Sequence, residues 1–191
     1  PIPYQGSKRH LASAILRYFP ASVPRLIEPF AGAAAVSLAA VLHRKAESVF
    51  LNDLNAPLME LWRCILDSPE GMHPATMREH ILAASRLLRG KTQIASQDYR
   101  EALLDARLDD LVYMDPPYQG VCHTRDPRYL QGVRFEEFCG ALKTLNKRDI
   151  SYILSYDGKC GPRLYGDPLP PDLSLALIEI DAGRSSQATL L

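Results

Sequence analysis

The chain has 191 residues, of which 47% are hydrophobic and 23% charged, and its 22 basic residues balance 22 acidic ones. This composition excludes a disordered chain, a collagen-like repeat and a small disulfide scaffold. No apolar run approaches the roughly 20 residues of a membrane-spanning helix, and the N-terminal residues lack the apolar core of a secretory signal. The length fits one α/β domain, or one such domain with a small insertion.

The four cysteines, Cys64, Cys122, Cys139 and Cys160, form no CxxC pair, and no histidine lies at metal-ligand spacing from them. Free thiols in a reducing compartment are therefore expected. We predict a cytoplasmic protein without a metal site.

Strand and helix patterns alternate along the chain. In chain order, the pattern predicts a helix at 8–18, a strand at 25–30, a helix at 33–44, a strand at 48–52, helices at 55–66 and 76–88, strands at 92–96 and 111–114, a helix at 135–145, strands at 151–156 and 175–180, and the start of a strand at 188. This alternation favours a mainly parallel sheet with right-handed crossovers.

Candidate site residues directly follow the expected strands. In such a sheet, ligands bind beyond the carboxyl ends of the strands, near the point where the strand order reverses. The residues at these ends are Glu28, Pro29, Phe30, Ala31 and Gly32, then Asp53, then Asp98, then Asp115, Pro116, Pro117 and Tyr118.

The tetrapeptide at 115–118, Asp-Pro-Pro-Tyr, combines rigidity with hydrogen-bond acceptors. Two successive prolines hold the backbone extended. The Pro116 carbonyl and the Asp115 carboxylate then form two fixed acceptors that suit an exocyclic amine, and Tyr118 offers a ring for stacking. A proline turn with Asp115 as a local backbone acceptor explains the tetrapeptide equally well.

The small-residue turn around Gly32 allows a ligand or a helix to approach the backbone closely. Tight packing of a strand against a helix is the alternative explanation. Asp53, after the second strand, is placed to accept hydrogen bonds from ribose hydroxyls. A cap on the helix that follows is the commoner use of an aspartate there.

Together these segments resemble the Dam-like, D12 class of DNA adenine-N6 methyltransferases of restriction-modification or phage type. The resemblance spans nearly the whole chain and rests on YQGSK at 4–8, EPFAG at 28–32, Asn-Asp at 52–53, Asp-Tyr at 98–99, DPPY at 115–118, SYDG at 155–158 and GRSSQATLL at 183–191. It implies an α/β, Rossmann-like, S-adenosylmethionine-dependent methyltransferase fold with a mainly parallel central sheet and a small helical insertion. It also implies S-adenosylmethionine as cofactor, S-adenosylhomocysteine as product, and no metal.

The resemblance assigns roles to the matching positions. The positions for the cofactor are Tyr4, Lys8, Glu28, Pro29, Phe30, Ala31, Gly32, Asp53, Asp98, Tyr99 and Asp115, and the catalytic positions are Asp115, Pro116, Pro117 and Tyr118. Within this set, Tyr4 and Lys8 close over the cofactor, Asp53 binds its ribose, and Asp98 lies near its adenine ring. The family usually has a second glycine where this chain has Ala34, whose methyl group is expected to tune cofactor affinity.

The implied chemistry is direct transfer to the amine nitrogen of a flipped adenine. Two acceptors on the amine hydrogens favour a pyramidal nitrogen and stabilise the positive charge that develops on it. In-line attack on the sulfonium methyl then needs positioning and electrostatics but no covalent enzyme intermediate.

Basic residues follow the DPPY segment directly. Arg125 and Arg128 are expected to contact DNA, whereas Lys143, Lys147 and Arg148 are expected to form a solvated loop and helix end. The expected partner is double-stranded DNA. A cognate restriction endonuclease is a further candidate partner, and the protein is expected to be a monomer or weak dimer.

The catalytic domain is expected at 1–55 and 92–191, with 56–91 as a small helical insertion that is the remnant of a target-recognition region. Because this insertion is short, we expect a recognition segment at the junction 68–72 to be absent from the sequence. The stop at Leu191, within an expected strand, leads to the same expectation for the C-terminus. Cytosine-N4 methylation is an alternative, although that class more often has Ser or Asn at the position of Asp115. A catalytically silent DNA-binding module is another. A dehydrogenase is disfavoured because no GxGxxG fingerprint lies near 28–36.

Overall fold

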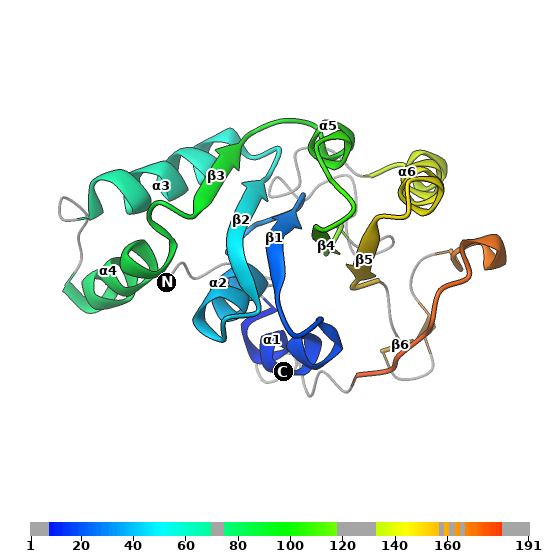
Figure 1. Cartoon of the computed structure of the whole chain (residues 1–191), viewed down its shortest axis with the longest axis horizontal. Helices are drawn as coiled ribbons and strands as arrows, with labels where there is room; N and C mark the ends of the chain where they lie inside the picture. Colours follow the sequence, from blue (N-terminus) through cyan, green and yellow to red (C-terminus); the bar gives the residue numbers. More distant parts are fainter. Residues whose placement is uncertain are drawn as a thin grey trace.

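A five-stranded parallel sheet forms the centre of the molecule in this computed structural model, which describes residues 8–69, 75–117, 133–156, 159–160, 163–164 and 167–180. The strand order is β3-β2-β1-β4-β5 (Figure 1), and each neighbouring pair is parallel. The strands are β1 Val23–Glu28, β2 Ala46–Asn52, β3 Thr92–Ala95, β4 Leu111–Met114 and β5 Ser151–Leu154. The predicted α/β class and mainly parallel sheet are therefore confirmed.

Helices cover both faces of this sheet. They are η1 Lys8–His10, α1 Ala12–Ile15, η2 Leu16–Tyr18, α2 Ala35–Leu42, α3 Ala56–Asp67, α4 Ala75–Leu88, α5 Tyr99–Leu104, α6 Phe135–Lys147 and η4 Pro171–Leu173. Neighbouring side chains of a strand point to opposite faces. Leu26 of β1 is accordingly fully buried in the cluster with α1 to α4, and Ile27 in the cluster with α5 and α6.

The helices α3 and α4 share the core of the sheet. Trp62 and Ile65 of α3 and Ile81 and Leu88 of α4 are buried in the same cluster as β1 and β2. The segment 56–91 is thus packed as part of this α/β unit, and its descent from a target-recognition region stays a prediction.

Three local predictions differ from the structure. The helix expected at 8–18 is a series of short turns, η1, α1 and η2, and the six-residue helix α5 was not predicted. The segment 175–180 is not a strand, and its Leu177 is 89% exposed. Its apolar residues suit a strand locally, but a strand also needs a neighbour, and 175–180 pairs with none in the described part of the chain.

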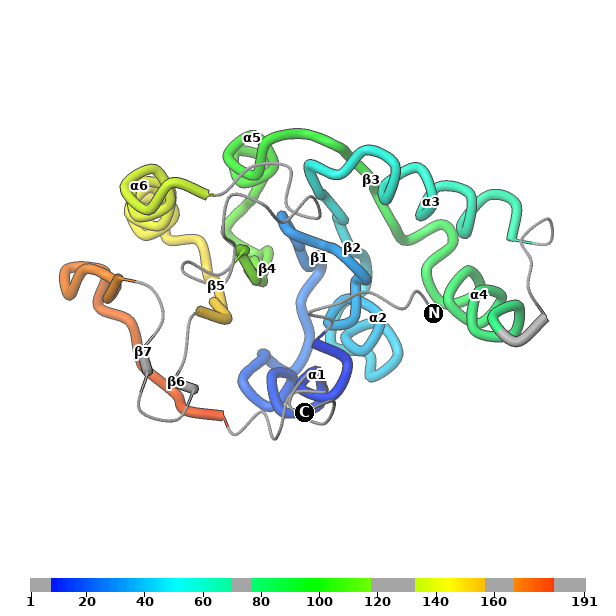
Figure 2. Tube along the Cα trace, turned by 180° about the vertical axis from the view of Figure 1, so that it is seen from behind, coloured from blue at the N-terminus to red at the C-terminus, as the bar shows by residue number. Residues whose placement is uncertain are grey.

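A short antiparallel pair, β6 Lys159–Cys160 and β7 Arg163–Leu164, forms a second, two-stranded sheet. The view from behind shows α3 beside β3 and α6 beside β5 at the two ends of the main sheet (Figure 2). Cys64 and Cys139 are free thiols, as expected. The strand start expected at 188 lies outside the described residues. Within the described ranges, no helix combines the length and the apolar character that crossing a membrane requires.

The strand order reverses between β1 and β4. The chain runs outward from β1 through β2 to β3, then returns to the other side of β1 to form β4 and β5 (Figure 1). At such a point the loops after the two strands leave on opposite faces and open a crevice at the carboxyl edge. Glu28 ends β1, and Asp115 directly follows β4, so both lie beside this point.

Candidate active site

Glu28 is the last residue of β1, and it is buried, with only 3% of the residue exposed. Its Oε2 accepts hydrogen bonds from the backbone N–H of Ser37, at 3.2 Å, and from the Ser37 hydroxyl. Burial raises the pKa of Glu28 to about 8, against the effect of the Ser37 hydrogen bonds, and the charges of Asp115 and Asp53 raise it further. A group with this pKa is mostly protonated at neutral pH.

The turn after β1 has two residues in the left-handed region, Gly32 and Ala34, both with φ of 48°. Three contacts hold this turn. The Gly32 N–H donates to Asp53 Oδ2 at 2.9 Å, the Trp62 Nε1–H donates to the Gly32 carbonyl at 3.0 Å, and the Ala31 N–H donates to the Asn52 carbonyl at 2.8 Å. The Ala34 side chain is fully buried in the core, so its methyl group packs among apolar residues.

Asp53 links the end of β2 to this turn. Its second oxygen, Oδ1, accepts from the Asn55 N–H at 3.0 Å, and the Asn55 side chain in turn caps α3 by accepting from the Leu58 N–H. Burial raises the pKa of Asp53, although the backbone N–H groups of Asn55 and Gly32 oppose that rise. Asn55, and not Asp53, therefore caps the helix that follows. The ribose contact of Asp53 stays a prediction.

Asn52 joins the ends of three strands and was not among the predicted site residues. Its side chain is fully buried. The Nδ2 group donates to the carbonyls of Pro29 and Gln97, at 3.1 and 3.0 Å, and Oδ1 accepts from the Gln97 N–H at 3.1 Å. This one amide fixes the loops after β1 and β3 relative to β2. A polar residue at the end of an apolar strand was the available signal.

Asp115 follows β4 and pairs with a lysine from the N-terminal segment. Lys8 Nζ lies 2.7 Å from Asp115 Oδ1, with the two side chains 12% and 19% exposed. Pro116 is buried. Lys8 was expected to close over the cofactor, and the structure places its ammonium group on the carboxylate of the DPPY motif. Asp115 also lies close enough to Glu28 for its charge to raise the pKa of Glu28.

The end of β3 contributes an ion pair and an aromatic ring. Asp98 caps α5 and pairs with Arg100 at 2.8 Å, and the side-chain hydrogen bond from Arg100 lowers the pKa of Asp98. The Tyr99 ring lies 5.1 Å from that of Phe30 and 6.0 Å from that of Phe138, between centroids. The structure thus brings Tyr99 against the turn after β1, while the cofactor roles of Asp98 and Tyr99 stay predictions.

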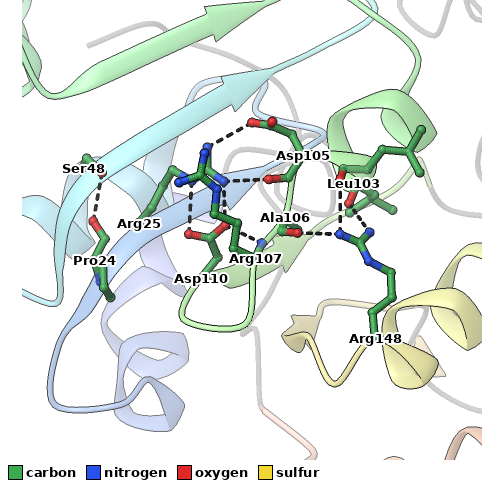
Figure 3. A network of polar contacts seen from close by, with 10 residues as sticks. Pro24, Arg25, Ser48, Leu103, Asp105, Ala106, Arg107, Asp110 and Arg148 are labelled. Carbon is green, nitrogen blue, oxygen red and sulfur yellow. Dashed lines mark hydrogen bonds and ion pairs between the residues drawn. The ribbon is translucent and has the colours of Figure 1, made fainter.

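A basic network lies at the opposite, amino-terminal edge of the sheet. Arg25 of β1 pairs with Asp110 at 2.6 Å and with Asp105 at 3.0 Å (Figure 3). Arg148 donates to the carbonyls of Leu103 and Ala106 near the end of α5 (Figure 3), and also to that of Leu104. Arg148 therefore has a structural role at this edge, in agreement with the interpretation of its cluster as a helix end.

Four predicted site residues, Tyr4, Tyr118, Arg125 and Arg128, lie outside the described residues. The structure brings together the other groups at the reversal point: Glu28, the turn at Gly32, Asp53 and Asp115. Among the described residues, no group of three or more histidine, cysteine, aspartate or glutamate side chains is arranged to hold a metal ion.

An open parallel sheet in this order, with a glycine turn and carboxylates at its reversal point, defines a Rossmann-like fold. The yhhF protein of Escherichia coli, named as a candidate methyltransferase, has this fold: it is 14% identical, the match covers 84% of this chain and 77% of that one, and the TM-score is 0.50. The rRNA methyltransferase aviRa of Streptomyces viridochromogenes is 21% identical over 78% of this chain and 72% of that one, with a TM-score of 0.46.

The chain belongs to the family of D12 class N6 adenine-specific DNA methyltransferases, whose model matches residues 4–77 and 73–167. It is therefore an enzyme that transfers methyl groups, and the resemblance seen in the sequence is confirmed. A further solved structure, a candidate methylase HI0767 of Haemophilus influenzae, is 14% identical over 84% of this chain and 77% of that one, with a TM-score of 0.47. No curated protein matches the sequence.

Proposed function

We propose that this enzyme transfers a methyl group from S-adenosylmethionine to N6 of an adenine flipped out of double-stranded DNA. The observation that carries this proposal is the position of Asp115 and Pro116, which directly follow β4 beside the glycine turn of β1. Two acceptors at the reversal point suit an exocyclic amine, and the family to which the chain belongs acts on adenine N6.

The residues around the turn fit a cationic cofactor. Asp53 and Asp115 both lie within electrostatic reach of Glu28, and opposite charges attract strongly in a partly buried site. Gly32 has no side chain, so a ligand can approach its backbone. S-Adenosylmethionine carries a sulfonium and an ammonium charge, and when bound it supplies an activated methyl group. Glu28 and the turn would hold its methionine end, and Asp53 its ribose.

The task of Asp115 is to accept a hydrogen bond from the target amine. In the structure its Oδ1 accepts from Lys8, so an incoming amine must share or replace that contact. Lys8 keeps the partly buried carboxylate compensated until then. Acceptors that hold the amine hydrogens direct the nitrogen lone pair out of the ring plane. The rate enhancement comes from this positioning and from electrostatic stabilisation of the positive charge that develops on the nitrogen.

Duplex DNA is the proposed substrate because the acceptors after β4 reach only a base that has left the stack, at a cost of a few kcal/mol. Tyr118 would stack on that base, and Arg125 and Arg128 would contact phosphates. A cognate restriction endonuclease remains a candidate partner.

The test is Asp115→Ala, assayed for transfer of labelled methyl from S-adenosylmethionine to duplex DNA and for cofactor binding by calorimetry. We expect transfer to be abolished while the cofactor dissociation constant changes only a few-fold. Asp115→Asn, which keeps one acceptor oxygen, is expected to lose roughly 10²- to 10³-fold in rate.

Asp109→Ala is the matched control, because Asp109 is an exposed aspartate at the other end of β4. This variant should transfer methyl groups at the native rate. Undiminished transfer by Asp115→Ala, or a native protein that binds no S-adenosylmethionine, would refute the proposal.

A further inference from the structure

Ser37 holds the buried carboxyl group of Glu28. It lies in the first turn of α2, directly behind the glycine turn, and is fully buried. Both its hydroxyl and its backbone N–H donate to the same atom, Glu28 Oε2. Two donors of one residue therefore fix Oε2, and among the described residues no hydrogen bond reaches the other oxygen, Oε1.

The acidic groups that face Glu28 disfavour a negative charge on its carboxyl group. Asp53 approaches from the loop after β2 and Asp115 from the loop after β4, and the Lys8 ammonium from η1 is paired with Asp115. Burial removes the water that would otherwise stabilise a carboxylate. Glu28 therefore holds its proton until a cation arrives, in keeping with its raised pKa of about 8.

We propose that Ser37 is a positioning residue that prepares Glu28 to lose its proton when the cationic end of the methyl donor binds. This inference rests on the proposed function, in which the donor is S-adenosylmethionine. The O–H bond of the Glu28 carboxyl breaks, its proton passes to the buffer, and the carboxylate that remains accepts the two Ser37 hydrogen bonds and faces the donor cation. Donor binding is thereby coupled to proton release.

The coupling predicts how donor affinity depends on pH. Below pH 8 the proton must be displaced, so Glu28 makes the affinity rise with pH by up to tenfold per unit, and above pH 8 this contribution of Glu28 levels off. The Ser37 hydrogen bonds favour the carboxylate, so Ser37→Ala should move the break in the profile to a higher pH. Glu28→Gln has no proton to lose and should show no such break.

The experiment is isothermal titration calorimetry of the full chain with S-adenosylmethionine in buffers of different ionisation enthalpy. For the native protein at pH 7 we expect release of about 0.9 proton per donor bound, from a pKa of about 8. At pH 8.5 the Glu28 contribution of the native protein falls to about 0.2 proton, whereas that of Ser37→Ala should be clearly larger. The α-amino group of the donor, with an ordinary pKa of about 8, contributes equally to both proteins and cancels in the difference. Ser37→Thr, which keeps the hydroxyl, should restore the native profile.

Two further arms complete the design. Titration with S-adenosylhomocysteine, which keeps the ammonium but lacks the sulfonium charge, identifies the cation: proton release with both ligands indicates the ammonium group, and release only with S-adenosylmethionine indicates the sulfonium. Ser48→Ala is the matched control, because the Ser48 hydroxyl donates to the Pro24 carbonyl away from the site (Figure 3). Its proton release should equal that of the native protein.

Binding of S-adenosylmethionine at pH 7 without proton release would overturn this inference and leave the proposed function standing. An unchanged pH profile in a folded Ser37→Ala variant would overturn the role of Ser37. If Ser37→Ala does not fold, the proton release of the native protein and of Ser37→Thr still tests the inference. Absence of S-adenosylmethionine binding at every pH would refute the inference and the proposed function together.

Discussion

Trp62 is predicted to hold the glycine turn for the cofactor, although it lies on α3. The Trp62 side chain is fully buried, and its Nε1–H donates to the Gly32 carbonyl at 3.0 Å. Trp62→Phe keeps an aromatic ring in the core but removes this donor. Leaving the carbonyl without it costs about 1–3 kcal/mol, and the smaller ring leaves a void that costs about another 1 kcal/mol. We expect the free energy of unfolding to fall by about 2–4 kcal/mol.

Part of this loss should fall on cofactor binding, because Gly32 lies in the turn that the cofactor approaches. If about 1.4 kcal/mol of it does, the dissociation constant of S-adenosylmethionine rises about tenfold. Urea denaturation measures the first effect and calorimetry the second.

Arg63→Ala is the control for Trp62→Phe, since the neighbouring Arg63 is 43% exposed and pairs only with the exposed Glu60 in the described structure. Such a pair contributes about 0–1 kcal/mol. A Trp62→Phe protein no less stable than Arg63→Ala would refute the energetic argument. A destabilised Trp62→Phe protein that binds the cofactor with native affinity would refute the link to the turn.

Three other substitutions follow from single features of the site. Tyr99→Phe removes a buried hydroxyl that has no hydrogen-bond partner among the described residues, so the free energy of unfolding should rise by about 1 kcal/mol in urea denaturation; a loss of stability would contradict this. Ala34→Gly relieves a left-handed backbone but adds unfolded-state entropy, so stability should change by less than about 1 kcal/mol, whereas Ala34→Val should lose about 2–4 kcal/mol; equal Tm values for the two variants would argue against strain at this position. Glu28 has a pKa of about 8 in the folded protein, above its ordinary value of 4.5, so its contribution to stability is fully present below pH 4.5 and is lost as the pH rises to about 8. The Tm of Glu28→Gln relative to that of the native protein should therefore increase between pH 5 and pH 8. A constant difference in Tm would show that folding does not raise the pKa of Glu28.

The sequence predicts the parts of this site that depend on local pattern. The strand at 111–114 has the bounds seen in the structure, because an apolar run ends at Asp115 and two prolines. Glu28, Gly32 and Asp53 follow strands in the same way, and a parallel sheet brings such ends to one edge. Knowing that the sheet is parallel was therefore enough to place these residues together.

Contacts over long sequence separations were not predicted. In the sequence, Trp62 is one of several apolar residues on a helical face. Only the packing of α3 against the sheet shows that its Nε1–H donates to the Gly32 carbonyl. The Lys8–Asp115 pair joins residues 107 positions apart. The helix α5 is short, although Asp98 is a favoured residue for its cap. At 175–180 a local pattern favours a strand, but strand pairing is itself a long-range contact.

The identity of the methylated base tests the central claim most directly. Duplex DNA is incubated with the native protein and labelled S-adenosylmethionine, digested to nucleosides and separated. We expect the label of the native protein to elute as N6-methyl-2′-deoxyadenosine, and the Asp115→Ala variant to produce no labelled nucleoside. Label in N4-methylcytosine, or no label in any DNA tested, would contradict it.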